Sequence, residues 1–268
     1  MNPETAIDVI LVNHNSGEAL DHCLKTLGSG DSEGLKIWVV DNASGDDSAT
    51  DLQSDMPLSI ISNPENLGFA KACNQGAKQG QAEFLAFINP DCFVNVQQLQ
   101  KLSDGLKNDA EAALIGCRVL NEDGSLQAAS RRRLPTFWRV VFHVTGLSRW
   151  SWFPGINIHD IGQFASVKKV SAVNGACLLV KRTAFEKIQG FDENYPLHFE
   201  DLDLFARLQK GGGRVLYDST VEVVHLKGHS KQTPKQIKVW KKQGMLRYFN
   251  QHRPRWEAAL VKFILALS

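Results

Sequence analysis

Long apolar runs are missing from this chain. A membrane-spanning helix needs roughly 18 or more consecutive apolar residues, and no stretch of the sequence reaches that length. Residues 1–8 are polar and lack the basic segment followed by an apolar segment that marks a secretory signal. We therefore expect a cytoplasmic protein without a membrane-spanning segment.

A surplus of charge and a pattern of paired cysteines are missing too. The net charge of +1 gives no overall field that would attract nucleic acid, so no nucleic-acid partner is expected. The five cysteines show no CxxC spacing, which argues against a zinc site and predicts reduced thiols in the core: Cys23, Cys73, Cys92, Cys117 and Cys177. The 268 residues are enough for one large α/β domain, or one domain and a tail.

Strands and helices alternate through the first half of the sequence. Apolar runs predict strands at 9–12, 37–40, 59–61 and 84–88. Helical spacing or capping residues predict helices at 19–27, 46–52 and 69–78, and around Leu99 to Leu106. This alternation predicts a Rossmann-like α/β fold, with a mainly parallel sheet flanked by helices.

The alternation breaks after Cys117. Residues 121–124 form a hairpin-type turn, and 131–164 are basic, aromatic and interrupted by prolines, which predicts a long irregular insert. Strands are expected at 176–180, 214–217 and 221–225, and helices at 183–188 and 202–210. From Thr233 onward the chain is expected to be helical.

Two of the predicted strands end in an aspartate. The strand at 37–40 is followed by Asp41, and the strand at 84–88 is stopped by Pro90 and followed by Asp91. Alone, Asp91 is equally well explained as a turn cap or as a ligand. Together the two aspartates favour a nucleotide site at the carboxyl edge of the sheet, where a hard cation holds phosphates.

Two further polar groups stand out. Glu200, Asp201 and Asp203 place three carboxylates in four positions; the first two suit a helix start, but their mutual repulsion favours a nearby cation or a role as proton acceptor. His225 ends an apolar strand, which alone indicates a structural histidine. A polar and cationic cluster suited to a diphosphate follows it: Lys227, His229, Ser230 and Lys231.

Seven strings of the sequence carry a resemblance to a known family. They are VILVNHNSG, VVDNASGDDS, NPENLGFAKACNQG, FLAFINPD, VNGACLLVKR, GFDENYPLHFEDLDLFARLQKGGGRVLY and VVHLKGHS. In this order they resemble the inverting glycosyltransferases of family 2, which have the GT-A fold, over about residues 8–230. Within the family the chain is most similar to bacterial rhamnosyltransferases that build surface polysaccharides.

The resemblance implies a division of the chain. Residues 1–230 would form the GT-A domain, with a nucleotide-sugar-binding half at 1–117 and an acceptor-binding and catalytic half at 118–230. Residues 231–268 would form a helical C-terminal tail.

The resemblance also assigns roles to single residues. Val12, Asn13 and Asn15 would line the base pocket, and Asp41 would hydrogen-bond the base. Asp201 would be the catalytic base. The nucleotide and its sugar would be bordered by Asn66, Gly68, Lys71, Asn74 and Asn89. The acceptor would contact Glu200, Arg131, Arg132, Trp138, Asn174 and Gly175.

The metal site departs from the family pattern. Asp91 would bind Mg²⁺ or Mn²⁺ as the last member of the DxD motif, with His225 approaching from the other side. Asn89 replaces the first acid of that motif, and because an amide supplies no charge we expect weaker metal affinity.

The resemblance implies a donor and an acceptor. The donor would be a nucleotide sugar, with dTDP-rhamnose favoured over a UDP-hexose on the subfamily resemblance alone. The acceptor would be a glycan or a polyprenyl-diphosphate-linked glycan. A sugar nucleotidyltransferase is the competing enzyme class, but residues 13–17 replace the Gly- and Arg-rich loop it would need. A catalytically degenerate binding module is suggested only by Asn89.

Two segments remain open. The insert, with Arg131 to Arg133 and its aromatic residues, is equally well explained as a lid over the acceptor or as a small satellite core beside a solvated charge run. The tail carries an apolar helical face at Trp256, Leu260, Phe263, Ile264 and Leu267. Docking of this face onto the main domain, or onto a second subunit as a homodimer, is favoured over contact with the cytosolic face of the inner membrane.

Overall fold

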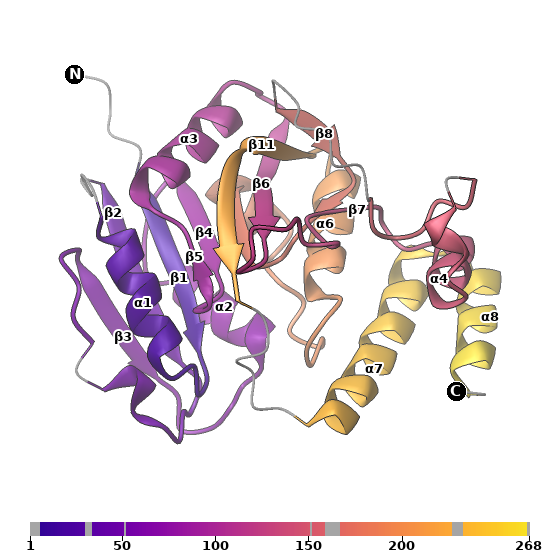
Figure 1. The fold of residues 1–268 in the computed structure, drawn as a ribbon, viewed down its shortest axis with the longest axis horizontal. Helices are drawn as coiled ribbons and strands as arrows, with labels where there is room; N and C mark the ends of the chain where they lie inside the picture. The colour runs from indigo at the N-terminus through magenta and orange to yellow at the C-terminus, as the bar shows by residue number, and fades with distance from the viewer. Residues whose placement is uncertain are drawn as a thin grey trace.

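A computed structural model describes residues 6–29, 34–50, 52–150, 152–158, 167–226 and 233–266 (Figure 1). The strands are β1 (Ile7–Asn13), β2 (Leu35–Asp41), β3 (Leu58–Ser62), β4 (Phe84–Ile88), β5 (Cys92–Phe93), β6 (Ala112–Leu120), β7 (Arg131–Arg132), β8 (Lys168–Val170), β9 (Ala172–Val173), β10 (Cys177–Lys181) and β11 (Arg214–His225). The helices are α1 (Glu18–Leu27), α2 (Phe69–Ala77), α3 (Val96–Lys107), α4 (Phe137–Val144), α5 (Arg182–Lys187), α6 (Glu200–Lys210), α7 (Pro234–His252) and α8 (Arg255–Ala266), with 3₁₀ turns η1 (Asp47–Ala49) and η2 (Leu147–Arg149).

The main sheet is mixed but mostly parallel. Its order is β3-β2-β1-β4-β10-β6-β11-β5, and β8 pairs with β11. Strands β1 to β4 are parallel to one another, β10 runs antiparallel between β4 and β6, and β11 is parallel to β6. The carboxyl ends of β1, β2, β4, β6 and β11 therefore meet at one edge of the sheet, as the predicted fold requires.

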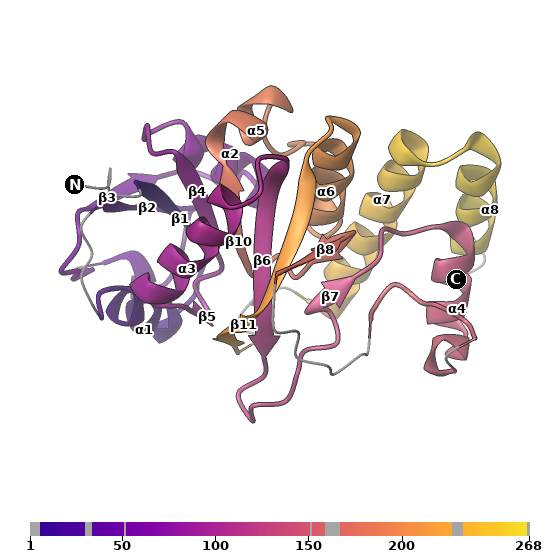
Figure 2. The same ribbon diagram turned by 90° about the horizontal axis from the view of Figure 1, so that it is seen from above.

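Helices cover both faces of this sheet (Figure 2). Side chains alternate along β1: Ile7, Val9 and Leu11 pack under α1 and α3, whereas Ile10 and Val12 join the core beneath α2, α5 and α6. Burial on both faces explains why these strands are continuous apolar runs rather than alternating ones. All five cysteines are buried in these cores as free thiols, which confirms the prediction of reduced core cysteines.

Three local predictions need correction. The helix expected at 46–52 is only the turn η1, because the Asp46 carboxylate accepts from Ser48 N (3.2 Å) and competes with continued helical bonding. The strands expected at 214–217 and 221–225 form one strand, β11, which contains a bulge after Asp218. The insert at 131–164 is not wholly irregular: Thr136 caps α4, with its Oγ1 accepting from Arg139 N (3.3 Å).

The predicted helical tail is confirmed as α7 and α8. Helix α7 starts at the Thr233 cap with Pro234 in its first turn, and the chain turns at Pro254 into α8. Gly244 of α7 lies so close to the loop before α6 that a Cβ there would approach the carbonyl oxygen of His198 at 2.7 Å. None of the helices in the described residues is both long and apolar enough to cross a bilayer.

The amino-terminal edge of the sheet holds a buried ion pair. Asp8 of β1 accepts from Arg182 Nη2 (2.6 Å), Trp38 Nε1 (2.9 Å) and Ala82 N (2.9 Å). This network joins β1, β2 and the start of α5 at the edge opposite the carboxyl ends. The predicted boundary between halves, at residues 117 and 118, falls inside β6; the division into two functional halves stays a prediction.

Candidate functional site

A cavity of about 530 Å³ opens at the carboxyl edge of the sheet. That volume lies in the range of small-molecule sites. Its lining comprises Val12, His14, Ser16, Asn42, Asn66, Leu67, Gly68, Phe69, Asn89, Pro90, Asp91, Pro196, Leu197 and Trp240. Five of the residues expected to bind the donor or the metal are therefore brought together: Val12, Asn66, Gly68, Asn89 and Asp91.

A hydrogen-bonded layer lies beside this cavity at the ends of β1 and β2. Asn13 Nδ2 donates to Asp41 Oδ1 (2.9 Å), and Asn13 is fully buried. Asn15 Oδ1 accepts from Gly45 N (2.7 Å), and the backbone of Asn15 has φ 56°. These polar groups hold the two strand ends together, and their roles in base binding stay predictions.

Asn42 organises the cavity wall and was not singled out from the sequence. Its Oδ1 accepts from Leu67 N (2.9 Å), and its Nδ2 donates to Asn66 Oδ1 (2.8 Å). The turn then reaches Gly68 with φ 83°, a conformation that glycine adopts readily. The only sequence signal for Asn42 was its place directly after Asp41.

Lys71 and Asn74 are not among the lining residues of this cavity. Lys71 is exposed on α2. Asn74 is buried and pairs with the backbone of Phe191, since its Nδ2 donates to the carbonyl (2.9 Å) and its Oδ1 accepts from the N–H (2.9 Å). Asn74 therefore joins α2 to the loop before α6, and no contact with a donor follows from its position.

Asp91 and His225 meet at the cavity. His225 Nε2 lies 3.1 Å from Asp91 Oδ1, and Asn89 Nδ2 lies 3.4 Å from the same nitrogen. Gln127 fixes the histidine from behind, because its Nε2 donates to the His225 carbonyl (2.8 Å) and its Oε1 lies 3.3 Å from Nδ1. Gln127 was missed from the sequence, where an isolated glutamine carries no motif.

Asp91, His225 and Asn89 suit a cation that takes most of its ligands from a bound substrate. Across the described part of the chain, no three His, Cys, Asp or Glu side chains are grouped so that they could enclose a metal ion. Asp91, His225 and the Asn89 amide offer at most three ligands. Such a partial set fits Mg²⁺ or Mn²⁺, which often take their other ligands from phosphate oxygens and water.

Asp201 lies in the first turn of α6 and is held by three neighbours. Its Oδ2 accepts from Arg132 Nη2, and its Oδ1 accepts from Leu202 N (2.7 Å). A Cβ at Gly175 would lie 2.9 Å from Asp201 Oδ2, so only glycine leaves room for the carboxylate. The preceding His198 and Phe199 both have positive φ, 67° and 71°, and such strain is typical of functional sites.

The segment 174–176 connects the base candidate to the metal candidate. Asn174 Nδ2 donates to Gln127 Oε1 (3.2 Å), and Gln127 contacts His225. Gly175 abuts Asp201, and the Ala176 carbonyl accepts from Asn89 N (2.9 Å). Residues far apart in sequence thus form one continuous set of contacts.

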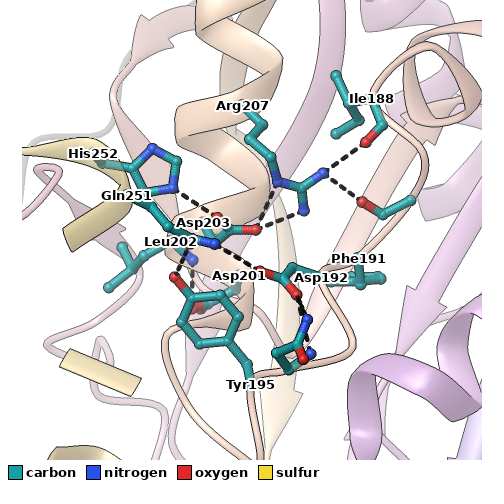
Figure 3. A network of polar contacts seen from close by, with 12 residues as sticks. Ile188, Phe191, Asp192, Tyr195, Asp201, Leu202, Asp203, Arg207, Gln251 and His252 are labelled. Carbon is teal, nitrogen blue, oxygen red and sulfur yellow. Dashed lines mark hydrogen bonds and ion pairs between the residues drawn. The ribbon is translucent and has the colours of Figure 1, made fainter. Parts of the chain in front are cut away.

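The three carboxylates of α6 have different surroundings. Asp203 is fully buried, where Arg207 Nε (2.7 Å) and His252 Nε2 (2.6 Å) compensate its charge and tie α6 to α7 (Figure 3). Glu200 is also buried, and its Oε2 has no hydrogen-bond partner. Burial, and then the neighbouring Asp201, raise the pKa of Glu200 to about 8. Repulsion in the cluster is thus relieved partly by Arg207 and partly by protonation.

Arg131 and Trp138, two of the residues predicted to contact the acceptor, are not among the lining residues of the cavity, and their acceptor roles stay predictions. Arg131 is buried, with its guanidinium 5.4 Å from the Tyr217 ring centre. Trp138 stands exposed on α4, stacked on Phe142 (6.1 Å between ring centres). Phe137 and Val140 of the insert do not form a separate core: they join the core cluster on one face of the main sheet, which also holds Ala258 and Val261 of α8. A role of the insert as a lid over the acceptor stays a prediction. The cationic cluster at Lys227, His229, Ser230 and Lys231 lies outside the described residues.

The fold and this cavity define a class of α/β proteins that bind ligands at the carboxyl ends of parallel strands. Comparison with known proteins identifies the family: the sequence model of the Glycosyl transferase family 2 matches residues 8–189. The chain belongs to this family. The match favours a glycosyltransferase over a sugar nucleotidyltransferase.

Similar proteins narrow the position within the family. An N-acetylglucosaminyl-diphospho-decaprenol L-rhamnosyltransferase of Mycobacterium tuberculosis is 28% identical over 237 residues, which cover 84% of this chain and 77% of the relative. Rhamnosyltransferase WbbL of Escherichia coli is 24% identical over 235 residues, which cover 84% and 85%. This is therefore a rhamnosyltransferase-like member of the family.

Solved structures support the fold. The mannosyltransferase PcManGT of Pyrobaculum calidifontis, in complex with GDP-Man and Mn²⁺, matches with a TM-score of 0.63 at 15% identity, over 93% of this chain. The match covers 64% of that longer chain, so this chain spans less than two thirds of it. At this identity the likeness establishes a GT-A-like fold.

Proposed function

We propose that this protein is an inverting, metal-dependent hexosyltransferase that uses Asp201 as its base. The observation that carries the proposal is the contact path from Asp91 through His225, Gln127 and the 174–175 segment to Asp201. This path supports a base at Asp201 and a cation at Asp91 and His225 as parts of one site. Asn89 does not argue for a degenerate module, because the base candidate and its glycine are both present.

The residues can divide the reaction between them. The acceptor hydroxyl attacks the anomeric carbon, the new carbon–oxygen bond forms, and the bond to the diphosphate oxygen breaks. Asp201 accepts the hydroxyl proton in this step, a role typically worth about 10²–10⁴-fold. Attack from the face opposite the diphosphate inverts the anomeric carbon. Asp91 and His225 would hold a divalent cation, which would neutralise the negative charge on the leaving diphosphate.

Arg132 positions Asp201 and is suited to the acceptor. Its Nε also donates to the Val173 carbonyl (2.9 Å), so the guanidinium is fixed beside the carboxylate. Arginine binds phosphate oxygens in a bidentate fashion. The diphosphate of an acceptor would compete with Asp201 for the Arg132 guanidinium. Asp201 would then lose its contact with Arg132 and be free to accept a proton.

The substrates follow from the relatives. The mycobacterial relative is named for an N-acetylglucosaminyl-diphospho-decaprenol acceptor and for L-rhamnosyl transfer. We extend the same classes to this chain: a dTDP-rhamnose donor, with a UDP-hexose as the alternative, and a polyprenyl-diphosphate-linked glycan acceptor for surface polysaccharide. Mn²⁺ in the solved mannosyltransferase supports Mg²⁺ or Mn²⁺ here. Such an acceptor would be met at the cytosolic face of a membrane.

The test is release of nucleoside diphosphate from a panel of nucleotide sugars, with Mg²⁺ or Mn²⁺ and a synthetic polyprenyl-diphosphate acceptor. Asp201→Asn should lower the rate about 10²-fold or more while nucleotide binding by calorimetry is kept. Asp123→Asn, in the exposed hairpin turn, is the control. Full activity in Asp201→Asn would show that Asp201 is not the base. Activity that persists after the divalent cation has been chelated would show that the reaction does not depend on a metal.

A further inference from the structure

Most large apolar side chains that are exposed in the described residues belong to helix α4, to the segment that directly follows it, or to helix α8. They are Trp138, Val144, Leu147, Trp150 and Trp152 on and after α4, and Trp256, Leu260, Phe263 and Ile264 on α8. Trp152 is 86% exposed and Phe263 is 65% exposed. We name these nine residues the α4–α8 face. Outside it, only Ile60 and Val239 in the described chain are comparable.

The two helices also contact each other, partly through Trp256 of the α4–α8 face. The Phe137 and Trp256 rings lie 6.3 Å apart, and Phe137 N donates to Glu257 Oε2 (2.9 Å). Ala258 and Val261 of α8 are buried in the same contact. Figures 1 and 2 show α4 and α8 side by side at the end of the molecule opposite β3. The face that the sequence predicted to dock is therefore the outer one.

Positive charge surrounds this face. The segment 131–155 has no acidic residue. Arg149, Arg255 and Lys262 are exposed around the face. The acid of α8, Glu257, is buried and paired with Arg253 Nε (2.9 Å). An apolar surface rich in tryptophan and ringed by cations has the composition of a membrane-interfacial helix.

A second copy of the chain fits this face poorly. A two-fold dimer would bring the same patch against itself, so the cations that ring the face would meet like charges. Anionic lipid headgroups offer the complementary charge, and the acyl region accommodates the exposed aromatic rings. The charge therefore distinguishes between the two occupants.

Helix α7 connects α8 to the cavity. Lys242 Nζ of α7 donates to the Leu265 carbonyl (3.1 Å), so the end of α8 runs back beside the first half of α7. Trp240, two residues away on α7, lines the cavity. Residues two apart on a helix point to nearly opposite sides, so α7 has α8 on one side and the cavity on the other.

We propose that the α4–α8 face docks the protein on an anionic membrane surface. The full chain is tested by flotation with vesicles of phosphatidylcholine alone or mixed with phosphatidylglycerol, without any substrate, so the result is independent of the proposed transfer reaction. We expect flotation with the mixed vesicles that falls with added salt. Trp256→Ser/Phe263→Ser should weaken it roughly tenfold or more. Arg255→Glu/Lys262→Glu should weaken it roughly fivefold for each basic residue replaced.

Ile60→Ser, an exposed apolar site on β3, is the matched control and should float like the parent. Each variant is checked for parental thermal unfolding and for mass by light scattering. The proposal is overturned if the parent does not float, or if the Trp256/Phe263 variant floats equally well. A parental dimer that this variant converts to a monomer, with flotation unchanged, would assign the face to a second copy instead.

Discussion

Glu200 should make the stability of this protein fall as the pH rises. The carboxyl is buried beside Asp201, and its Oε2 has no hydrogen-bond partner. Burial first, and Asp201 second, raise its pKa from the usual 4.5 to about 8 in the folded protein. The unfolded chain releases this proton near its ordinary pKa, whereas the folded chain keeps it up to the raised value.

The sign and size follow from proton linkage. Between pH 4.5 and about 8 the folded state binds more protons than the unfolded state, so raising the pH destabilises the fold. Each unit of pKa shift corresponds to about 1.36 kcal/mol, so the shift from 4.5 to about 8 is worth roughly 5 kcal/mol as an upper figure, of which roughly 4 kcal/mol falls between pH 5 and 8.5. Glu200→Gln keeps the shape of the side chain but cannot ionise. The variant should therefore not lose this stability as the pH rises.

The measurement is urea unfolding, followed by tryptophan fluorescence, of the parent and Glu200→Gln between pH 5 and 8.5. The two should be of similar stability at pH 5, and the variant should become more stable than the parent by up to roughly 4 kcal/mol at the upper end. Glu122→Gln, at an exposed carboxylate, is the control for the amide substitution. A difference between Glu200→Gln and the parent that does not change with pH, or that changes in the opposite direction, would refute the buried protonated carboxyl.

Three further substitutions probe other parts of the structure. Arg132→Ala should raise the KM for a diphosphate-bearing acceptor roughly tenfold or more while the donor KM holds, and Arg132→Lys should restore only part of the loss, as steady-state kinetics will measure. Gly175→Ala places a Cβ against Asp201 Oδ2, which it would meet at 2.9 Å, and should lower kcat by up to about 10²-fold with the fold retained by circular dichroism. Asp8→Ala leaves the largely buried Arg182 with only the longer ion pair to Glu186 (3.7 Å) among the described residues and should cost about 3–5 kcal/mol in urea unfolding while kcat/KM of the folded enzyme is unchanged.

Matched controls separate these effects from general damage. Arg149→Ala removes an exposed arginine and should leave acceptor KM unaltered. Gly45→Ala adds a Cβ with only an ordinary contact, 3.8 Å from Asn15 Oδ1, and should leave kcat near that of the parent. An acceptor KM unaffected in Arg132→Ala would show that Arg132 does not bind the acceptor. A normal kcat in Gly175→Ala would show that Asp201 is not positioned as argued.

The fold could be predicted from the sequence where burial requires apolar residues. Strands β1 and β4 lie between two layers of helices, so their apolar runs and the stop at Pro90 are direct consequences of their position. The 214–225 region was not predictable in this way: the polar residues 218–220 predict a break between two strands, whereas they lie at a bulge within one strand, β11. Local sequence cannot distinguish a strand end from a bulge, because the difference depends on whether the residues that follow still pair with β6.

The candidate site was predictable where a motif names the residue, as for Asp91 and Asp201. Residues that act through tertiary contacts were not. Gln127 holds His225 across 98 positions of sequence, and Trp240 reaches the cavity from α7, for which the sequence predicted helical structure but no role. Asp203 looked equivalent to its neighbours until Arg207 and His252 showed that its charge is compensated within the core.

Strand β10 sets an order for assembly of the chain. It is synthesised after β4 and β6, yet it fills the space between them and pairs with both. Until residue 181 has left the ribosome, the nascent chain exposes two unpaired strand edges, which are templates for wrong association. A fragment that ends at residue 117 should consequently aggregate rather than fold as a self-sufficient nucleotide-binding unit, and co-translational chaperoning would act before β10 is made.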